Sequence, residues 1–161
     1  GSGGDYLSYV LAVEEVSKIH ASLGIAYSVS VSLCAGGIFS SASEELKKKY
    51  LPDILSGKKL GSFGLTEPNA GSDASGAQTT ALKDGDHYIL NGSKCFITNG
   101  PLSDTFLVFA FTDKSLGNKG LSAFIVEKDF PGFSIGKIEN TCGIRSAQVS
   151  ELIFKIGRAH V

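Results

Sequence analysis

The pattern of the chain changes near residue 58, and this change constrains the fold more than any other feature. From Leu60 onward, short runs rich in Val, Ile, Phe and Thr are separated by Gly, Asn, Asp and Pro. Short strands with glycine-containing turns at roughly regular spacing are typical of small antiparallel barrels and sandwiches. We expect strands at 79–82, 87–90, 94–98, 105–111, 121–126 and 152–154, with turns at Asp84-Gly85-Asp86, Asn91-Gly92 and Asn99-Gly100-Pro101.

The first 57 residues are expected to be rich in helix. Asp5 can cap a helix in which apolar residues follow at helical spacing. Residues 41–44 have the form of a capping box, which predicts a further helix, and Gly57 is a natural stop for it. The sequence therefore predicts helices in residues 1–57 and an all-β module after them.

An uncharged stretch, residues 21–43, is open to several interpretations. Its length raises the question of a membrane span, but seven serines and three glycines make it too polar to cross a bilayer. Residues 27–33 alternate with a period of two, which is typical of a half-buried strand. Small residues all round would equally suit a helix packed closely between other helices. The residues themselves leave strand and helix undecided.

Composition excludes several classes of function. The 15 basic and 16 acidic residues are interspersed, so nothing favours binding to nucleic acid or to an anionic membrane. Three distant cysteines and three histidines without ligand spacing predict neither a disulfide framework nor a metal site, and they favour a reducing compartment. Because the chain has no methionine, we expect it to be a piece of a longer protein.

The stretch from Phe63 to Asp73 is the densest candidate for a ligand-binding loop. Its small residues and hydroxyls can present N–H groups to a phosphate or to a heteroaromatic edge. A plain cap-and-turn connection explains the same residues. Glu67 and Asp73 could form a pair of acid-base carboxylates, although Asp73 fits a helix cap better.

A second candidate site is the end of the expected strand at 94–98. Phe96 and Thr98 are two positions apart, so a regular strand would place both on one face. Phe96 could then stack on a flat ring while Thr98 donates a hydrogen bond to it. An ordinary strand that ends at a turn is an equally good interpretation.

Both candidate stretches resemble signatures of the acyl-CoA dehydrogenase family. Residues 63–72 are similar to [aromatic]-x-[apolar]-Thr-Glu-Pro-x-Ala-Gly-Ser, and residues 91–99 to Asn-Gly-x-Lys-x-[Trp/Phe]-Ile-Thr-Asn. Within the family, these residues most resemble those of short-chain, butyryl-CoA-type bacterial members. The chain has Thr141-Cys142 where members often have Lys-Met, and Ala147 where Ser is common. Further segments that resemble the family are 6–23, 120–128, 130–132 and 143–146.

The resemblance implies an α+β fold built from two domains. Residues 1–57 would be the end of an N-terminal helical domain, and residues 58–155 a small antiparallel β-barrel, the middle domain that binds FAD and acyl-CoA. A C-terminal four-helix domain would be absent, and residues 21–39 would be helical. FAD would lie between the barrel and the helices.

The implied activity is oxidation of an acyl-CoA to the trans-2-enoyl-CoA. In the family, a carboxylate base removes the α-proton, the β-hydrogen leaves as hydride to flavin N5, and electrons pass to an electron-transferring flavoprotein. No catalytic residue is expected in this chain, because that base comes from the missing C-terminal domain. The complete protein is expected to be a homotetramer in the bacterial cytoplasm. An acyl-CoA oxidase and a non-catalytic flavin- or acyl-CoA-binding relative are the alternatives.

The resemblance also assigns roles to residues of the two candidate stretches. Thr66 would bond the pyrimidine end of the flavin ring, Phe96 would cover a ring face, and Thr98 would hydrogen-bond near N5. Gly71 and Ser72 would approach the FAD pyrophosphate, and Ser72 also the acyl-CoA. The expected cofactor-binding residues are Phe63, Leu65, Thr66, Gly71, Ser72, Phe96, Ile97 and Thr98.

The last six residues depart from the family pattern. Residues 156–161 read Ile-Gly-Arg-Ala-His-Val, a translation of common sequencing-adapter DNA. We therefore hypothesise that they are a non-native tail. The same six residues in an intact genomic reading frame would refute this.

Overall fold

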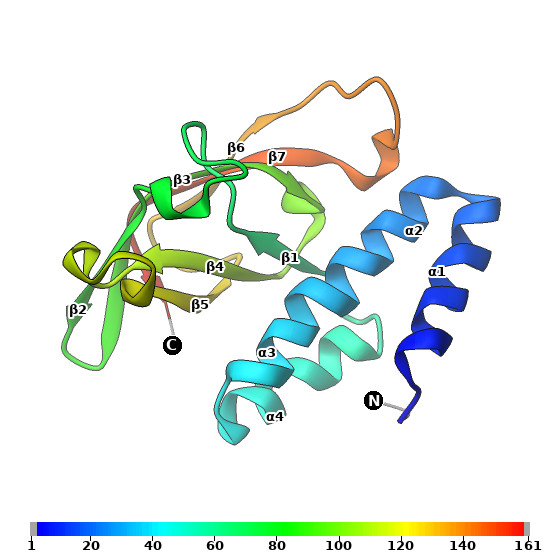
Figure 1. Ribbon diagram of the computed structural model, residues 1–161, viewed down its shortest axis with the longest axis horizontal. Helices are drawn as coiled ribbons and strands as arrows, with labels where there is room; N and C mark the ends of the chain where they lie inside the picture. Colours follow the sequence, from blue (N-terminus) through cyan, green and yellow to red (C-terminus); the bar gives the residue numbers. More distant parts are fainter. Residues whose placement is uncertain (1–2, 160–161) are drawn as a thin grey trace.

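The computed structural model describes the backbone of residues 3–159 and the side chains of residues 3–155. Within this range a layer of helices lies beside a curled sheet, and the chain passes from one to the other once, after α4 (Figure 1). The expected order, helices followed by strands, is confirmed. The helices are α1 (Tyr6–Ile19), α2 (Ala21–Ser28), α3 (Gly36–Ser41) and α4 (Glu44–Leu55).

Local signals set the ends of two helices. The carboxylate of Asp5 accepts a hydrogen bond at 2.8 Å from the backbone three residues on, as expected of a cap. Ser43 caps α4 in the same way, which confirms the helix predicted from residues 41–44. Gly57, with φ of +75°, follows the end of α4 in the left-handed conformation that glycine adopts easily.

Residues 21–41 form one continuous helix, in which a π-helical segment (Val29–Ala35) joins α2 to α3. The strand interpretation of residues 27–33 is therefore wrong, and the helix implied by the family resemblance is correct. Ser30 Oγ accepts a hydrogen bond from the Gly61 N–H at 3.0 Å, so this helix approaches the sheet backbone very closely. Small side chains are needed at such a contact, and they produced the misleading alternation.

The same helix is the one among the described residues that is long and apolar enough to cross a membrane, so the expectation that its serines and glycines make it too polar is wrong by this criterion. A buried core helix meets this criterion of length and composition equally well. Cys34, Ala35 and Ile38 are at most 3% exposed and pack against the sheet and α4. Packing against the sheet explains the lack of charge on this face of the helix, whereas Leu23, Leu33 and Phe39 are exposed.

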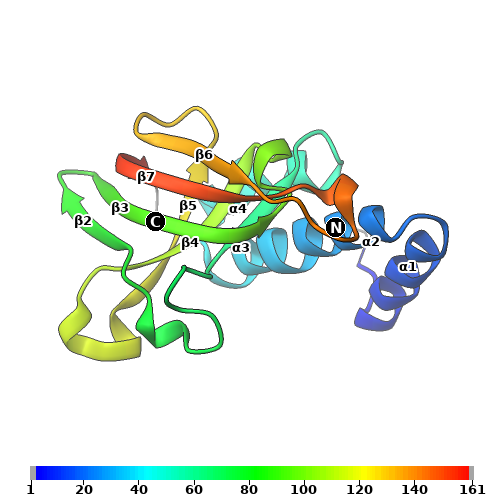
Figure 2. The same cartoon turned by 90° about the horizontal axis from the view of Figure 1, so that it is seen from above.

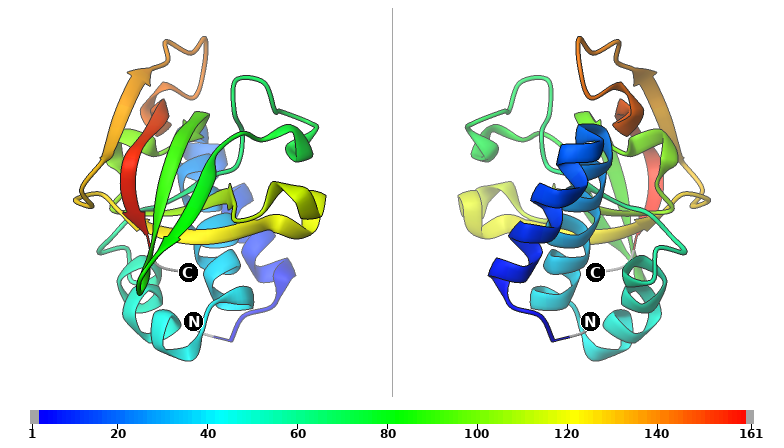
Figure 3. Two further views of the ribbon diagram at one scale, coloured as in Figure 1. Left: turned by 90° about the vertical axis from the view of Figure 1, so that its left-hand side faces the viewer. Right: turned by 90° about the vertical axis from the view of Figure 1, so that its right-hand side faces the viewer.

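The sheet has the order β1-β4-β2-β3-β7-β6, and β5 pairs with β4. Most pairs are antiparallel, as expected, but β1 runs parallel to β4, and β2 meets β4 through one parallel residue pair. The sheet curls so that β3 and β7 cross over β4 and β5, which makes a partly closed barrel (Figures 2 and 3). No expected strand corresponds to β6. The strands are β1 (Gly61–Gly64), β2 (Thr80–Asp84), β3 (His87–Thr98), β4 (Thr105–Phe111), β5 (Leu121–Glu127), β6 (Phe133–Ile138) and β7 (Val149–Ala159).

Strand β4 separates two hydrophobic cores because both of its faces are buried. Phe106, Val108 and Ala110 point into the barrel, where they pack with side chains of the strands around it. Leu107 points the other way and joins Ile125 in a core shared with α3 and α4. A strand buried on both faces has a continuous apolar sequence, which is why residues 105–111 were recognisable as a strand.

Two glycine-containing turn signals had different outcomes. The hairpin expected at Asp84-Gly85-Asp86 is present between β2 and β3. The turn expected at Asn91-Gly92 is wrong, because both residues lie inside β3, at a shift in its pairing with β7. Gly92 has φ of +147°, and a Cβ there would lie 2.6 Å from Thr79 Oγ1. This glycine allows the close approach of Thr79 to the backbone of β3.

The backbone of β7 continues to pair with β3 up to Ala159, which lies opposite Tyr88. The hypothesised tail, residues 156–161, overlaps this end of β7. Its side chains, and the whole of residues 160–161, lie outside the described residues. Whether the tail is native therefore stays a hypothesis.

Candidate functional site

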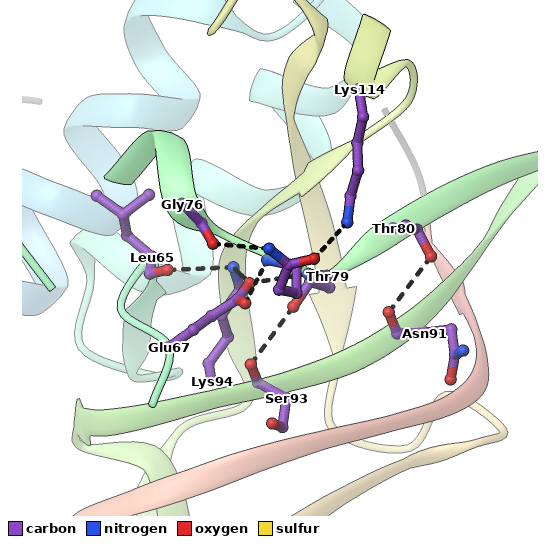
Figure 4. Close-up of polar contacts among 10 residues, drawn as sticks. Leu65, Glu67, Gly76, Thr79, Thr80, Asn91, Ser93, Lys94 and Lys114 are labelled. Carbon is purple, nitrogen blue, oxygen red and sulfur yellow. Dashed lines mark hydrogen bonds and ion pairs between the residues drawn. The ribbon is translucent and has the colours of Figure 1, made fainter. Parts of the chain in front are cut away.

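The two candidate stretches lie against each other at the end of the barrel where β1 leaves the sheet. The carbonyl of Thr66 accepts a hydrogen bond from the Cys95 N–H at 2.9 Å. The carbonyl of Leu65 accepts one from Lys94 Nζ at 3.1 Å (Figure 4). The loop that follows β1 is therefore bonded directly to β3 beside Phe96.

The backbone of Phe96 is unusual for an aromatic residue in a strand. Its φ is +57°, and it lies at a second shift in the pairing of β3 with β7. This bulge interrupts the regular alternation, so the expectation that Phe96 and Thr98 share a face by period two does not apply here. Phe96 is 66% exposed and lies between Cys95 and Ile97, which are buried. A non-glycine residue held in this conformation is often part of a functional site.

The remaining expected contacts on these two segments differ in exposure. The hydroxyls of Thr66 and Thr98 are half-buried, and neither makes a hydrogen bond to another described residue. Phe63 packs against Phe109, with ring centroids 5.1 Å apart. The side chain of Ile97 is 2% exposed and belongs to the barrel core, so a ligand could reach it only through its backbone.

Gly71 and Ser72 lie further out, on the exposed part of the loop. A Cβ at Gly71 would have no atom within 4 Å, so the backbone is open to approach. Asp73 accepts a hydrogen bond from the Ser75 N–H at 3.1 Å and caps a short 3₁₀ turn, as expected. The structure thus brings Leu65, Thr66 and Phe96 together and leaves Gly71 and Ser72 at a separate, exposed position.

Glu67 does not have the freedom that an acid-base residue needs. It is 5% exposed, and its carboxylate accepts hydrogen bonds from the Thr79 N–H at 3.0 Å and from Lys94 Nζ at 2.7 Å. Burial alone would raise the pKa of Glu67, but these bonds and one from the Gln78 N–H outweigh it and lower the pKa. Sequence reasoning did not single out Lys94, because its partner is 27 residues away.

The chemistry of these residues fits the flavin that the family resemblance implies. An exposed aromatic residue and two hydroxyls without a partner among the described residues match a flat heteroaromatic ring with a polar edge. Phe96, Thr66 and Thr98 would hold that ring, and Gly71 and Ser72 offer open backbone to a phosphate. Among the described residues, no group of His, Cys, Asp and Glu could hold a metal ion.

Comparison with known proteins agrees with this arrangement. Residues 1–58 match the family model "Acyl-CoA dehydrogenase, N-terminal domain", and residues 62–156 match "Acyl-CoA dehydrogenase, middle domain". The short-chain-specific acyl-CoA dehydrogenase of Clostridium acetobutylicum is 54% identical over 155 residues, which are 96% of this chain and 41% of that protein. Its namesake in Megasphaera elsdenii is 55% identical over 154 residues, 95% of this chain and 40% of that protein.

Solved structures give the same result. The butyryl-CoA dehydrogenase of Megasphaera elsdenii superposes with a TM-score of 0.94 at 53% identity, over 99% of this chain and 42% of that one. A chain from a structure described as the electron transferring flavoprotein of Acidaminococcus fermentans superposes with a TM-score of 0.96 at 56% identity, with the same coverage. The chain spans about two-fifths of the length of these relatives. It belongs to the acyl-CoA dehydrogenase family, with the family's N-terminal domain followed by its middle domain.

Proposed function

We propose that this chain forms the flavin-facing part of an FAD-dependent dehydrogenase that oxidises short-chain acyl-CoA to trans-2-enoyl-CoA. The proposal is supported by the relatives named for short-chain acyl-CoA and butyryl-CoA, which span almost the whole chain. The observation that carries it is the exposure of Phe96, next to Cys95, whose N–H bonds the Thr66 carbonyl, while the Thr66 and Thr98 hydroxyls make no hydrogen bond to another described residue.

The residues of this chain would bind and orient the cofactor. When FAD is bound, its flavin would be the hydride acceptor for the β-hydrogen of the substrate. A carboxylate from elsewhere in the complete protein would take the α-proton. Phe96 would cover one face of the ring and exclude water from it. Thr66 and Thr98 would hydrogen-bond its polar edge, each bond contributing about 0.5–1.5 kcal/mol.

Threonine-to-valine variants of the complete protein test this role. Val has nearly the shape of Thr but no hydroxyl, so Thr66→Val and Thr98→Val should each weaken FAD binding or shift the flavin absorbance and reduction potential. Thr66→Ser and Thr98→Ser keep the hydroxyl and should stay close to the parent protein. Valine variants with unchanged affinity, spectrum and potential would exclude the proposed contacts.

Two further statements depend on the complete protein. An electron-transferring flavoprotein is the proposed electron acceptor, supported by the Acidaminococcus fermentans structure and by the relative named caffeyl-CoA reductase-Etf complex subunit CarC, which is 45% identical. The assembly is proposed to be a homotetramer in the bacterial cytoplasm. Gel filtration of the complete protein, with and without that partner, tests both the assembly and the complex.

An oxidase is the second candidate function. A structure named as the prolyl acyl carrier protein oxidase AnaB superposes with a TM-score of 0.90 at 38% identity. An oxidase would produce hydrogen peroxide as it consumes acyl-CoA in air. A dehydrogenase would reduce the flavoprotein acceptor and form little peroxide, so a parallel assay of the two products decides between them.

A further inference from the structure

One buried ion pair has no part in the chemistry proposed above. Lys94 is fully buried and Glu67 is 5% exposed, and Nζ of the lysine lies 2.7 Å from Oε1 of the glutamate. Removing two such charges from water costs several kcal/mol, and the attraction between them returns little net stability. The position of the pair in the fold gives it another role.

The pair joins three separate segments of the chain (Figure 4). Lys94, on β3, also donates to the carbonyl of Leu65 at 3.1 Å, on the outgoing side of the loop. Glu67 accepts from the N–H groups of Thr79 at 3.0 Å and Gln78 at 2.5 Å, on the returning side. The two side chains therefore close the base of the loop and fasten both of its ends to the strand.

The neighbours of the pair along the chain are the proposed flavin contacts. Leu65 and Thr66 immediately precede Glu67, and Phe96 follows Lys94 by two residues. Another surface excursion, residues 113–120, is held differently, by the exposed carboxylate of Asp113 at its start and by bonds to the Gly120 carbonyl at its end. This shorter excursion is therefore closed without a buried charge pair.

We propose that Glu67 and Lys94 are positioning residues, which hold the loop beginning at Leu65 at a fixed separation from Phe96 and Thr98. Neither residue touches the reacting atoms. The pair acts by keeping the Thr66 and Thr98 hydroxyls and the Phe96 ring in register with one flat ligand. This inference rests on the proposed function, because the ligand is the flavin.

The test uses four variants of the complete protein. Glu67→Gln and Lys94→Met each leave one buried charge unpaired, and the double variant removes both. Lys49→Met is the matched control, because Lys49 also pairs with a glutamate at 2.9 Å, between α4 and β5, but is 52% exposed and lies away from the loop. For each protein, the thermal midpoint of unfolding of the apoprotein and the dissociation constant for FAD are measured.

Thermal stability and FAD affinity should respond differently to the double variant. Both single variants should lose thermal stability and bind FAD about tenfold more weakly or worse. The double variant should regain most of the stability, because no unpaired charge is left, yet still bind FAD about tenfold more weakly, because the loop is no longer fastened. The control should bind FAD as the parent does.

Any other result refutes either the positioning role or the proposed function, and the two failures can be told apart. If FAD affinity returns together with stability in the double variant, or never changes, the pair is structural only. If none of the Glu67 and Lys94 variants folds, the pair is a folding requirement and the positioning role is refuted. If the parent protein itself binds no FAD, the proposed function fails, whatever the variants do.

Discussion

Among single residues, Glu67 links the stability of the fold to pH. Its pKa is lowered from the ordinary value of 4.5, because hydrogen bonds from Lys94, Thr79 and Gln78 outweigh the effect of burial. The folded chain therefore binds fewer protons than the unfolded chain. The stabilisation is fully present above about pH 4.5 and is lost as the pH falls through the lower pKa of the folded state.

The variant Glu67→Gln should show this dependence directly. At about pH 7 it should lower the free energy of unfolding by about 3–5 kcal/mol, because it leaves the Lys94 ammonium buried without its partner. The difference from the parent chain should shrink as the pH falls below about 4.5, where the parent loses the same interaction. Urea unfolding of both chains across this range measures it. A difference that stays constant with pH would contradict the explanation.

The sequence was least able to predict the conformations and partners of individual residues. The left-handed backbone of Phe96 and the buried pairing of Lys94 depend on how β3 lies against β7 and against the loop. Such contacts join residues far apart in the sequence, so no local pattern records them. The family resemblance assigned a role to Phe96, and its second signature also contains the lysine that Lys94 matches, but it assigned that lysine no role.

For whole elements, prediction succeeded where the determinant was local. The hairpin at Asp84-Gly85-Asp86 and the apolar run of β4 needed only their own residues. It failed at Asn91-Gly92, because strand pairing on both sides overrode a strong turn dipeptide. The parallel pairing of β1 with β4 joins residues 44 positions apart and could not be read from periodicity.

The contact between the π-helical segment and β1 gives a prediction for these two elements. A Cβ at Gly61 would lie 2.8 Å from Cβ and Sγ of Cys34, whose thiol is fully buried with its pKa raised to about 12. Gly61→Ala should therefore push the helix from the sheet and destabilise the chain by about 1–3 kcal/mol. Thermal unfolding measures the loss.

Gly143→Ala is the matched control for that substitution. A Cβ at Gly143 would meet no atom within 4 Å, and its φ is not positive. This variant should unfold within about 0.5 kcal/mol of the parent. If Gly61→Ala were equally stable, the helix would not be fixed to β1 as described.

For the molecule as a whole, the described part of the proposed flavin site includes Glu67, whose carboxylate is not free to act as a base. Glu67 is occupied by its three donors. We expect the 161-residue chain to show no dehydrogenase activity on butyryl-CoA with a dye as electron acceptor. The complete protein, assayed beside it, should reduce the dye, and dye reduction by the 161-residue chain alone would disprove the expectation.

The core shared by the helices and the outer face of β4 and β5 has a consequence for how the family's domains evolve. The boundary between the two family models falls at residues 58–62, yet Leu107 and Ile125 on one side are covered by α3 and α4 on the other. We therefore expect the two parts to unfold together, as one cooperative unit. A chimera that joins the helices of one relative to the barrel of another would have poorly matched side chains in this shared core. The residues of α3 and α4 and those on the outer face of β4 and β5 would have to be exchanged together.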